Sequence, residues 1–244
     1  MATVFAPVEE TTPAEYRRVT EVTYLGYVHG TLAALKRMRP RDRGTIIQIG
    51  SALAYRSIPL QGAYCAAKAA IRGFTDSLRT ELLHDGSRIK VTMLQLAAVN
   101  TPQATRQRNK MPRQARPVPP MFSPESIAAL VVRAADDPPR EMLIGRPTIQ
   151  AVWAQKLVPG LLDWYLGKYG YESQMVDAPN AQVERREGDI LFDTLPGDPG
   201  AHGPYRDEER GPDVAMRLLA HPRLAAGAIG TVALVASFVR RRRR

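Results

Sequence analysis

The chain has 244 residues, enough for one domain of ordinary size with extensions, and its hydrophobic fraction of 44% suits a packed globular core. Its net charge is +10, but five of the positive charges are Arg240 to Arg244, so the remainder is only mildly basic and gives little support for a nucleic-acid partner. Cys65 is the single cysteine, which excludes an intrachain disulfide, and the four histidines show no metal-ligand spacing, so we predict no metal site.

The first predicted element is a long helix that begins after Thr12. Thr12 has the character of an N-cap, Pro13 suits the first turn, and Glu15 closes a capping box. Apolar residues continue at helical spacing until Pro40 stops the helix.

A short β-branched run, Thr45 to Ile49, follows and is bounded by Gly44 on one side and by Gly50 and Ser51 on the other. It has no helical period, which is typical of a strand buried on both faces in a parallel sheet. The next helix carries Tyr64 and Lys68 one turn apart on its apolar stripe, with Ile71, Phe74, Thr75, Leu78 and Leu82.

Beyond this helix, Ile89 to Leu96 is predicted to be another buried strand. Residues 101–122 hold five basic residues and no acidic one, without an apolar period. They suit either an anion-binding or membrane-facing loop or a mobile, solvated flap, and the prolines favour the flap.

The pattern then returns to regular elements. Ser123 and Pro124 begin a helix that runs through Ala135, Glu141 to Ile144 suit a short strand, and residues 148–168 suit one more helix. Alternating helices and strands of this length predict an α/β fold, a parallel sheet with helices on both faces.

We predict three regions: an α/β domain over 1–170, a disordered linker over 171–212 and a C-terminal region over 213–244. The last contains a short helix from Asp213 to Ala220 and an apolar stretch, Leu224 to Val239, before the terminal arginines.

As a helix, those sixteen apolar residues would span about 24 Å, against a hydrocarbon core of about 30 Å. Flanking arginines can snorkel, so we expect membrane contact through Leu224 to Val239, with the terminal arginines on the cytoplasmic side. The alternative is a helix docked on the protein's own surface, in a cytoplasmic protein.

Ser51, Tyr64 and Lys68 are the candidate catalytic residues. A tyrosine has a pKa of about 10, so it exchanges protons poorly at neutral pH unless a nearby cation stabilises the phenolate. Lys68 could do this from one turn away, while Ser51 could hold a carbonyl or alkoxide oxygen. Tyr-x-x-x-Lys alone is weak evidence, since an exposed helix-surface pair would look the same.

The whole stretch from Gly44 to Thr80, GTIIQIGSALAYRSIPLQGAYCAAKAAIRGFTDSLRT, resembles the active-site segment of the short-chain dehydrogenase/reductase family. The resemblance implies a doubly wound Rossmann-type sheet with NAD or NADP as hydride carrier. It implies that Ser51 contacts the substrate oxygen, that Tyr64 is the acid/base, and that Lys68 lowers the tyrosine pKa and binds the nicotinamide ribose. Thr101 matches the threonine that contacts the carboxamide.

Three departures from the family pattern stand out. Thr23 occupies the place of the catalytic asparagine, and Ala97-Ala98 replace the usual Pro-Gly. The TGxxxGxG loop and the NNAG stretch do not occur in the sequence, and both belong upstream of Thr3. The chain therefore resembles the truncated, C-terminal half of such an enzyme, with a partial doubly wound sheet.

Two functions follow from these observations. The first is an NAD(P)-dependent oxidoreductase that interconverts a hydroxyl and a carbonyl on a small apolar substrate. The second is a non-catalytic fragment or membrane-tethered interaction protein that keeps the family scaffold. A homo-oligomer is plausible, because the family uses the helix that carries Tyr64 in dimer contacts.

Overall fold

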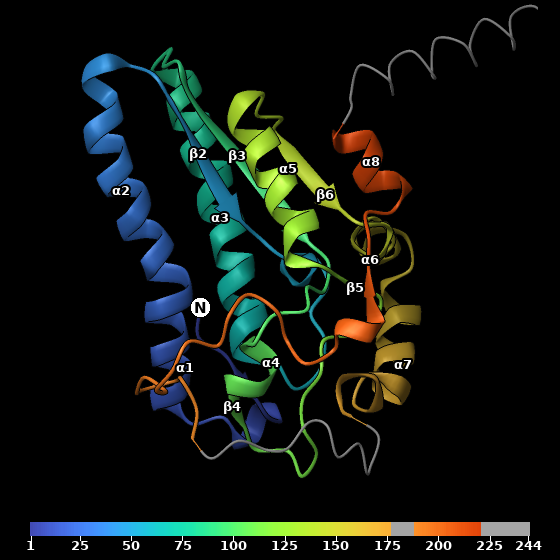
Figure 1. Cartoon of the computed structure of the whole chain (residues 1–244). Helices are drawn as coiled ribbons and strands as arrows, with labels where there is room; N and C mark the ends of the chain where they lie inside the picture. The colour runs from blue at the N-terminus through green and yellow to red at the C-terminus, as the bar shows by residue number, and fades with distance from the viewer. Residues whose placement is uncertain (177–187, 221–244) are drawn as a thin grey trace, which may run out of the picture.

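A three-stranded parallel sheet occupies the centre of the computed structural model, which describes residues 1–176 and 188–220 (Figure 1). The strand order is β2-β3-β6, with β2 over Gly44–Ile49, β3 over Ile89–Leu96 and β6 over Glu141–Ile144. These bounds confirm the three predicted strands. Because all three run parallel, their carboxyl ends meet at one edge of the sheet.

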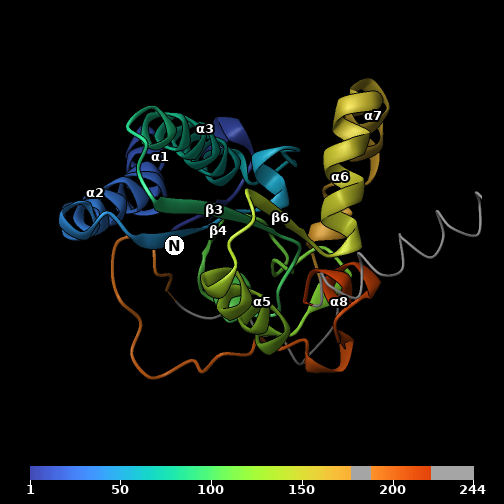
Figure 2. The same ribbon diagram turned by 90° about the horizontal axis from the view of Figure 1, so that it is seen from above.

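Helices cover both faces of this sheet (Figure 2). On one face lie α1 (Pro13–Val19), α2 (Gly26–Met38) and α3 (Gly62–His84), and on the other lie α5 (Pro124–Asp136) and α8 (Val214–Ala220). The predicted α/β class with helices on both faces is confirmed. Buried residues of α5 and α8 pack on β3 and β6 in one core cluster, which contains Leu94, Ile127, Leu130, Ile144 and Met216.

The long first helix begins as predicted and then changes its winding. The Thr12 side chain accepts a hydrogen bond from the backbone N–H of Glu15, and a carboxylate oxygen of Glu15 accepts one from the Thr12 N–H. A π-helical stretch, Thr20–Leu25, joins α1 to α2 and contains the buried Thr23. Such wide turns occur frequently at functional sites.

The helix predicted over 148–168 is two helices, α6 (Arg146–Leu157) and α7 (Pro159–Tyr169). Pro159 lacks an N–H and excludes the α-helical conformation at the preceding residue, and Val158 accordingly has φ −140° and ψ 55°. The chain therefore turns there and forms a helical hairpin.

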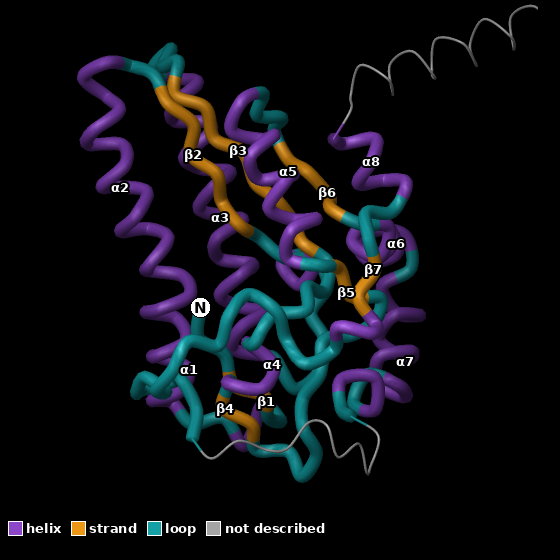
Figure 3. The backbone as a smooth tube through the Cα atoms, in the orientation of Figure 1, coloured by secondary structure: helices purple, strands orange, loops and turns teal. Residues whose placement is uncertain are grey.

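Two segments that we expected to lack fixed structure are ordered against each other at the carboxyl edge of the sheet (Figure 3). The first, residues 101–122, contains α4 (Gln103–Arg106), β4 (Arg108–Asn109) and β5 (Met121–Phe122). The described part of 171–212 contains a 3-10 helix, Glu172–Gln174, a second, Arg206–Glu208, and β7 (Glu209–Arg210). Parallel pairs join β4 to β1 (Val4–Phe5) and β5 to β7.

Charge complementarity explains why these two segments are ordered although the sequence predicted a solvated flap and a disordered linker. Arg108 donates to Asp189 at 2.8 Å, and Arg113 and Arg116 pair with Glu172 and Glu208. Leu191 and Tyr205 are buried in the same region. Each segment has too few apolar residues to order alone, but the pair neutralises its charges and shares a core.

The predicted apolar helix Leu224 to Val239, the terminal arginines and residues 177–187 of the predicted linker lie outside the described residues. Within residues 1–176 and 188–220, the helices are too short or too polar to cross a membrane.

Candidate active site

Ser51 lies two residues beyond the carboxyl end of β2 and is held there by β3. Its backbone N–H donates to Oε1 of Gln95 at 2.8 Å, and its hydroxyl accepts from the Leu53 N–H at 3.2 Å. Gln95 in turn donates to Glu141 of β6 at 2.9 Å. The three strands together therefore determine where Ser51 lies.

Lys68 extends from α3 to the end of the same strand. Its ammonium donates to the carbonyl oxygen of Ile49 at 2.8 Å and lies 5.6 Å from the ring centroid of Tyr64. Lys68 is buried and Tyr64 is partly buried, and the Tyr64 hydroxyl interacts with Ser51. The structure thus brings the three predicted catalytic side chains together.

The pKa values of Tyr64 and Lys68 differ from the sequence prediction, in which Lys68 lowers the pKa of Tyr64. Burial raises the pKa of Tyr64, and the hydrogen bond with Ser51 only partly opposes it. Burial lowers the pKa of Lys68 to about 8. The lysine ammonium faces the tyrosine ring, but its charge is not among the causes of the Tyr64 shift, so the structure does not show the lowering of the tyrosine pKa that we expected from Lys68.

Tyr27 is a residue of this site that the sequence analysis missed. Its hydroxyl donates to the carbonyl oxygen of Ile49 at 2.8 Å, the same oxygen that Lys68 contacts, and the Lys68 ammonium lies 5.2 Å from its ring centroid. Tyr27 follows Thr23 by four residues, so helical spacing on the first helix was the available signal.

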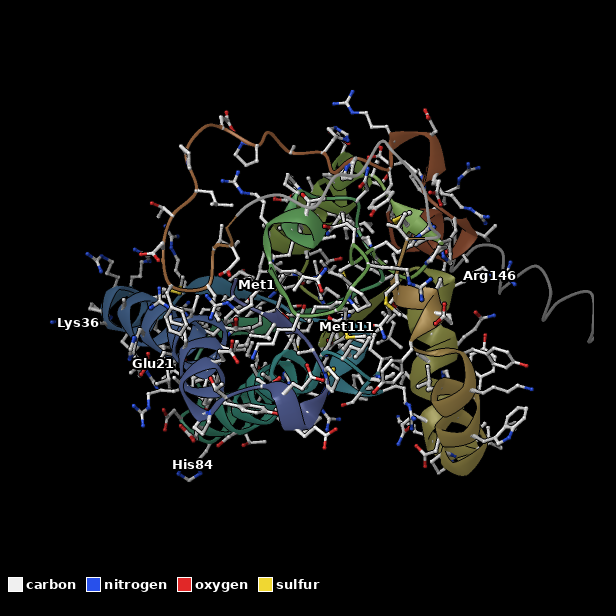
Figure 4. All side chains as sticks on the ribbon, turned by 90° about the horizontal axis from the view of Figure 1, so that it is seen from below. Met1, Glu21, Lys36, His84, Met111 and Arg146 are labelled. Atoms are coloured by element: carbon white, nitrogen blue, oxygen red, sulfur yellow. The ribbon has the colours of Figure 1, made fainter. Side chains whose placement is uncertain are left out.

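Thr23, in the place of the family's asparagine, binds the start of the chain. Its hydroxyl accepts from the Ala2 N–H at 3.0 Å and donates to the Ala2 carbonyl at 2.8 Å. Burial, and then the charge of Lys68, lower the pKa of the Met1 amino group. The first two residues therefore lie close to Lys68, and Figure 4 shows Met1 near the middle of the molecule.

Thr101 lies beyond the carboxyl end of β3, at the same edge of the sheet as Ser51. Its N–H donates to the Val99 carbonyl at 3.0 Å. Gly203 packs directly on it, because a Cβ at Gly203 would lie 2.6 Å from the Thr101 carbonyl oxygen. The observed contacts of Thr101 are thus with its own loop and with the segment around Gly203.

The side chains present fit the nicotinamide end of a dinucleotide. An ammonium has three donors, so Lys68 can hold Ile49 and also bind ribose hydroxyls. The diphosphate would need a glycine-rich turn at a helix N-terminus, and the sequence contains no TGxxxGxG. Within the described residues no group of three or more His, Cys, Asp or Glu side chains could hold a metal ion.

A parallel sheet with helices on both faces defines a Rossmann-like α/β fold, and in this chain Ser51, Tyr64 and Lys68 lie together at the carboxyl edge of the sheet. A family model described as short chain dehydrogenase matches residues 2–112. Over these residues the chain is similar to the short-chain dehydrogenase/reductase family.

Individual relatives show the same similarity. An uncharacterized oxidoreductase of Bacillus subtilis, YxnA, is 30% identical over 193 residues, which cover 78% of this chain and 53% of that protein. Human dehydrogenase/reductase SDR family member 7 is 46% identical over 67 residues, which cover 28% of this chain and 20% of that protein. The chain thus spans about half the length of YxnA, and less of the human relative.

Solved structures support the fold. A short-chain dehydrogenase from Streptomyces avermitilis superposes with a TM-score of 0.52 at 24% identity, covering 69% of this chain and 66% of that chain. One from Burkholderia cenocepacia, in complex with NADP, gives 0.53 at 23% identity, covering 68% and 65%.

Proposed function

We propose that this chain carries the acid–base machinery of an NAD(P)-dependent oxidoreductase that interconverts a hydroxyl and a carbonyl on a small apolar substrate. The observation that supports it most is the convergence of Ser51, Tyr64 and Lys68 at the end of β2. The relatives are oxidoreductases by name, and one structure with this fold holds NADP.

A bound nicotinamide would accept or supply the hydride. The chain's own residues would handle the oxygen and its proton. In the reducing direction, Ser51 donates a hydrogen bond to the carbonyl oxygen, and Tyr64 transfers its proton to that oxygen as negative charge develops. Burial raises the pKa of Tyr64, so its hydroxyl stays protonated at neutral pH and can serve as the proton donor in this direction, although as a weak acid.

Lys68 and Tyr27 would support this proton transfer. Both donate to the Ile49 carbonyl, which keeps the ammonium within 5.6 Å of the Tyr64 ring centroid. A positive charge there stabilises the phenolate that forms when the proton leaves.

The decisive experiment joins a glycine-loop half from another family member ahead of Ala2 and measures NADPH-dependent reduction of apolar ketones. Tyr64→Phe should reduce turnover by roughly a hundredfold or more while leaving NADPH affinity nearly unchanged, because only the proton donor is removed. Tyr24→Phe, which removes a hydroxyl elsewhere on the fold, is the matched control. Turnover by Tyr64→Phe within a few fold of the parent would disprove the assignment.

The chain by itself should not bind NADPH tightly. Ser51, Tyr64, Lys68 and Thr101 would meet only the nicotinamide end, so we expect calorimetry to show a Kd weaker than about 10 μM. Saturable binding tighter than this would reveal a diphosphate site that the sequence motifs do not contain.

One observation favours the alternative, a non-catalytic interaction protein. Among the described strands β2 pairs only with β3, so its other edge presents unpaired backbone groups that can bind a strand from another chain, including a second copy. Size measurement by light scattering separates the proposals, because stable association without turnover in the joined protein would support the interaction role.

A further inference from the structure

The hairpin formed by α6 and α7 exposes an unusual amount of apolar surface. Eight of the 17 exposed large apolar side chains in the described residues lie between positions 153 and 171. They include both tryptophans of the chain, Trp153 and Trp164, which are 54% and 60% exposed. Arg146 marks the start of α6, from which the hairpin extends away from the sheet (Figures 2 and 4).

The exposed residues of α7 form one face of the helix. Leu161, Trp164, Tyr165 and Tyr169 recur at three- and four-residue spacing, and each is at least 43% exposed. Leu162 and Leu166, which follow at the margin of this stripe, are partly buried. The hairpin is therefore packed on its inner side and presents a second apolar stripe outward.

Lysines lie within this aromatic surface. The Lys168 ammonium is 5.6 Å from the Trp164 ring centroid and 5.1 Å from that of Tyr169, and Lys156 is 5.2 Å from Trp153. Lysine is depleted in the cores of protein–protein interfaces, whereas tryptophan, tyrosine and snorkelling lysine are enriched where a protein meets lipid headgroups.

The charge of the hairpin suits an anionic surface. Residues 146–169 contain Arg146, Lys156 and Lys168 against one acid, Asp163, which is already paired with Arg56 at 2.8 Å. α8 begins beside α6, since the Asp213 carboxylate accepts from the Arg146 N–H at 2.6 Å. The chain beyond α8 continues with sixteen residues from Leu224 to Val239 that include no charged residue, and then with five arginines.

We propose that the outer face of the α6–α7 hairpin docks on an anionic lipid surface, with the aromatic rings at headgroup depth and the lysines against the phosphates. The face lies on the membrane and does not span it. Arg56 donates to Gln155 at 2.8 Å, so docking would bring the loop between Ser51 and Tyr64 near the lipid. The proposal does not depend on the chain having catalytic activity.

The two tryptophans make the test direct, because intrinsic tryptophan fluorescence reports only on this hairpin. The full chain is mixed with phosphatidylcholine vesicles with and without phosphatidylglycerol, and with brominated lipids that quench tryptophan on contact. We expect a blue shift and quenching that require phosphatidylglycerol and weaken as salt rises.

Leu161→Glu with Tyr165→Glu keeps both tryptophans and should weaken vesicle binding by roughly tenfold or more. The matched control is Leu32→Glu with Leu83→Glu, two exposed apolar positions on α2 and α3, which should bind like the parent. Circular dichroism checks that both variants fold.

Three results would overturn the proposal. Sedimentation with vesicles without tryptophan quenching would assign binding to residues outside the hairpin. Equal vesicle binding by the hairpin variant and the parent would also assign binding to residues outside the hairpin. A blue shift that depends on protein concentration without lipid would show that a second copy covers this face.

Discussion

Gly50 separates β2 from Ser51, and Gln95 requires this residue to have no side chain. A Cβ at position 50 would lie 2.3 Å from the Gln95 Oε1 atom that accepts the Ser51 N–H. Any side chain there would displace Gln95 and, with it, the contact to Glu141. The position of the candidate catalytic serine therefore depends on a glycine one residue earlier.

At the residue scale, the buried cation Lys68 lowers the stability of the folded chain. The side chain is 2% exposed, and burial lowers its pKa to about 8 from the usual 10.5. Between about pH 8 and 10 the unfolded chain therefore holds more protons at this position than the folded chain. The free energy of unfolding should rise with pH over that window.

We accordingly expect Lys68→Met to stabilise the protein at pH 7 by about 2 kcal/mol, because methionine has a similar length but no charge to bury. It should also flatten the rise in stability between about pH 8 and 10. Urea unfolding of the parent and variant across this range measures both effects. Lys36→Met, at an exposed lysine on α2, should change neither, and a destabilised Lys68→Met would contradict the argument.

At the scale of the element, the start of α1 depends on Glu15. Its carboxylate accepts from the Thr12 N–H and from Lys110, both at 2.8 Å, and from Arg108 at 3.2 Å. Burial would raise its pKa, but these hydrogen bonds and charges lower the pKa to about 2. One side chain thus caps a helix and holds the loop that contains β4.

Glu15→Gln should reduce the free energy of unfolding at pH 7 by about 3 kcal/mol, because it leaves two cations beside a neutral amide. The parent's stability from this group is present above the unfolded pKa near 4.5 and is lost as pH falls toward about 2. The variant should lack that part of the acid dependence. Urea unfolding between pH 7 and 2.5 tests this, with the exposed Glu21→Gln as control.

At the scale of the whole molecule, the segments around positions 108 and 190 close the carboxyl edge of the sheet. The Arg18 guanidinium donates to the Leu191 carbonyl at 2.8 Å, and the Ile190 N–H donates to the Arg106 carbonyl at 2.9 Å. Leu191 joins a core cluster with Val4 and Val19. The start of the chain and the segment around position 190 therefore share one core.

Leu191→Ala tests whether this region is part of the folded domain. The side chain is 1% exposed, so its truncation should cost about 2 to 4 kcal/mol, measured by urea unfolding. The neighbouring Phe192→Ala, at a side chain that is 45% exposed, should cost less than about 1.5 kcal/mol. If Leu191→Ala leaves the free energy of unfolding almost unchanged, the prediction of a disordered linker would be correct for this region.

The elements that the sequence predicted best are those with a strong local signal. The capping box at Thr12 and Glu15 and the β-branched run after Gly44 depend on residues close together in the chain. The convergence of Ser51, Tyr64 and Lys68 follows in the same way, because one strand end and one helical turn place them. Their catalytic roles stay predictions.

Local sequence by itself thus determined the α/β class, the bounds of β3 and β6, and the candidate catalytic group. Only the tertiary structure decided that Tyr27 shares the Ile49 carbonyl with Lys68, and that two charged segments form one ordered edge. Their partners are distant, as with Arg108 and Asp189, which are 81 residues apart. Segments that cannot bury enough apolar surface alone show no periodic pattern, so their order depends on contacts that only the folded chain creates.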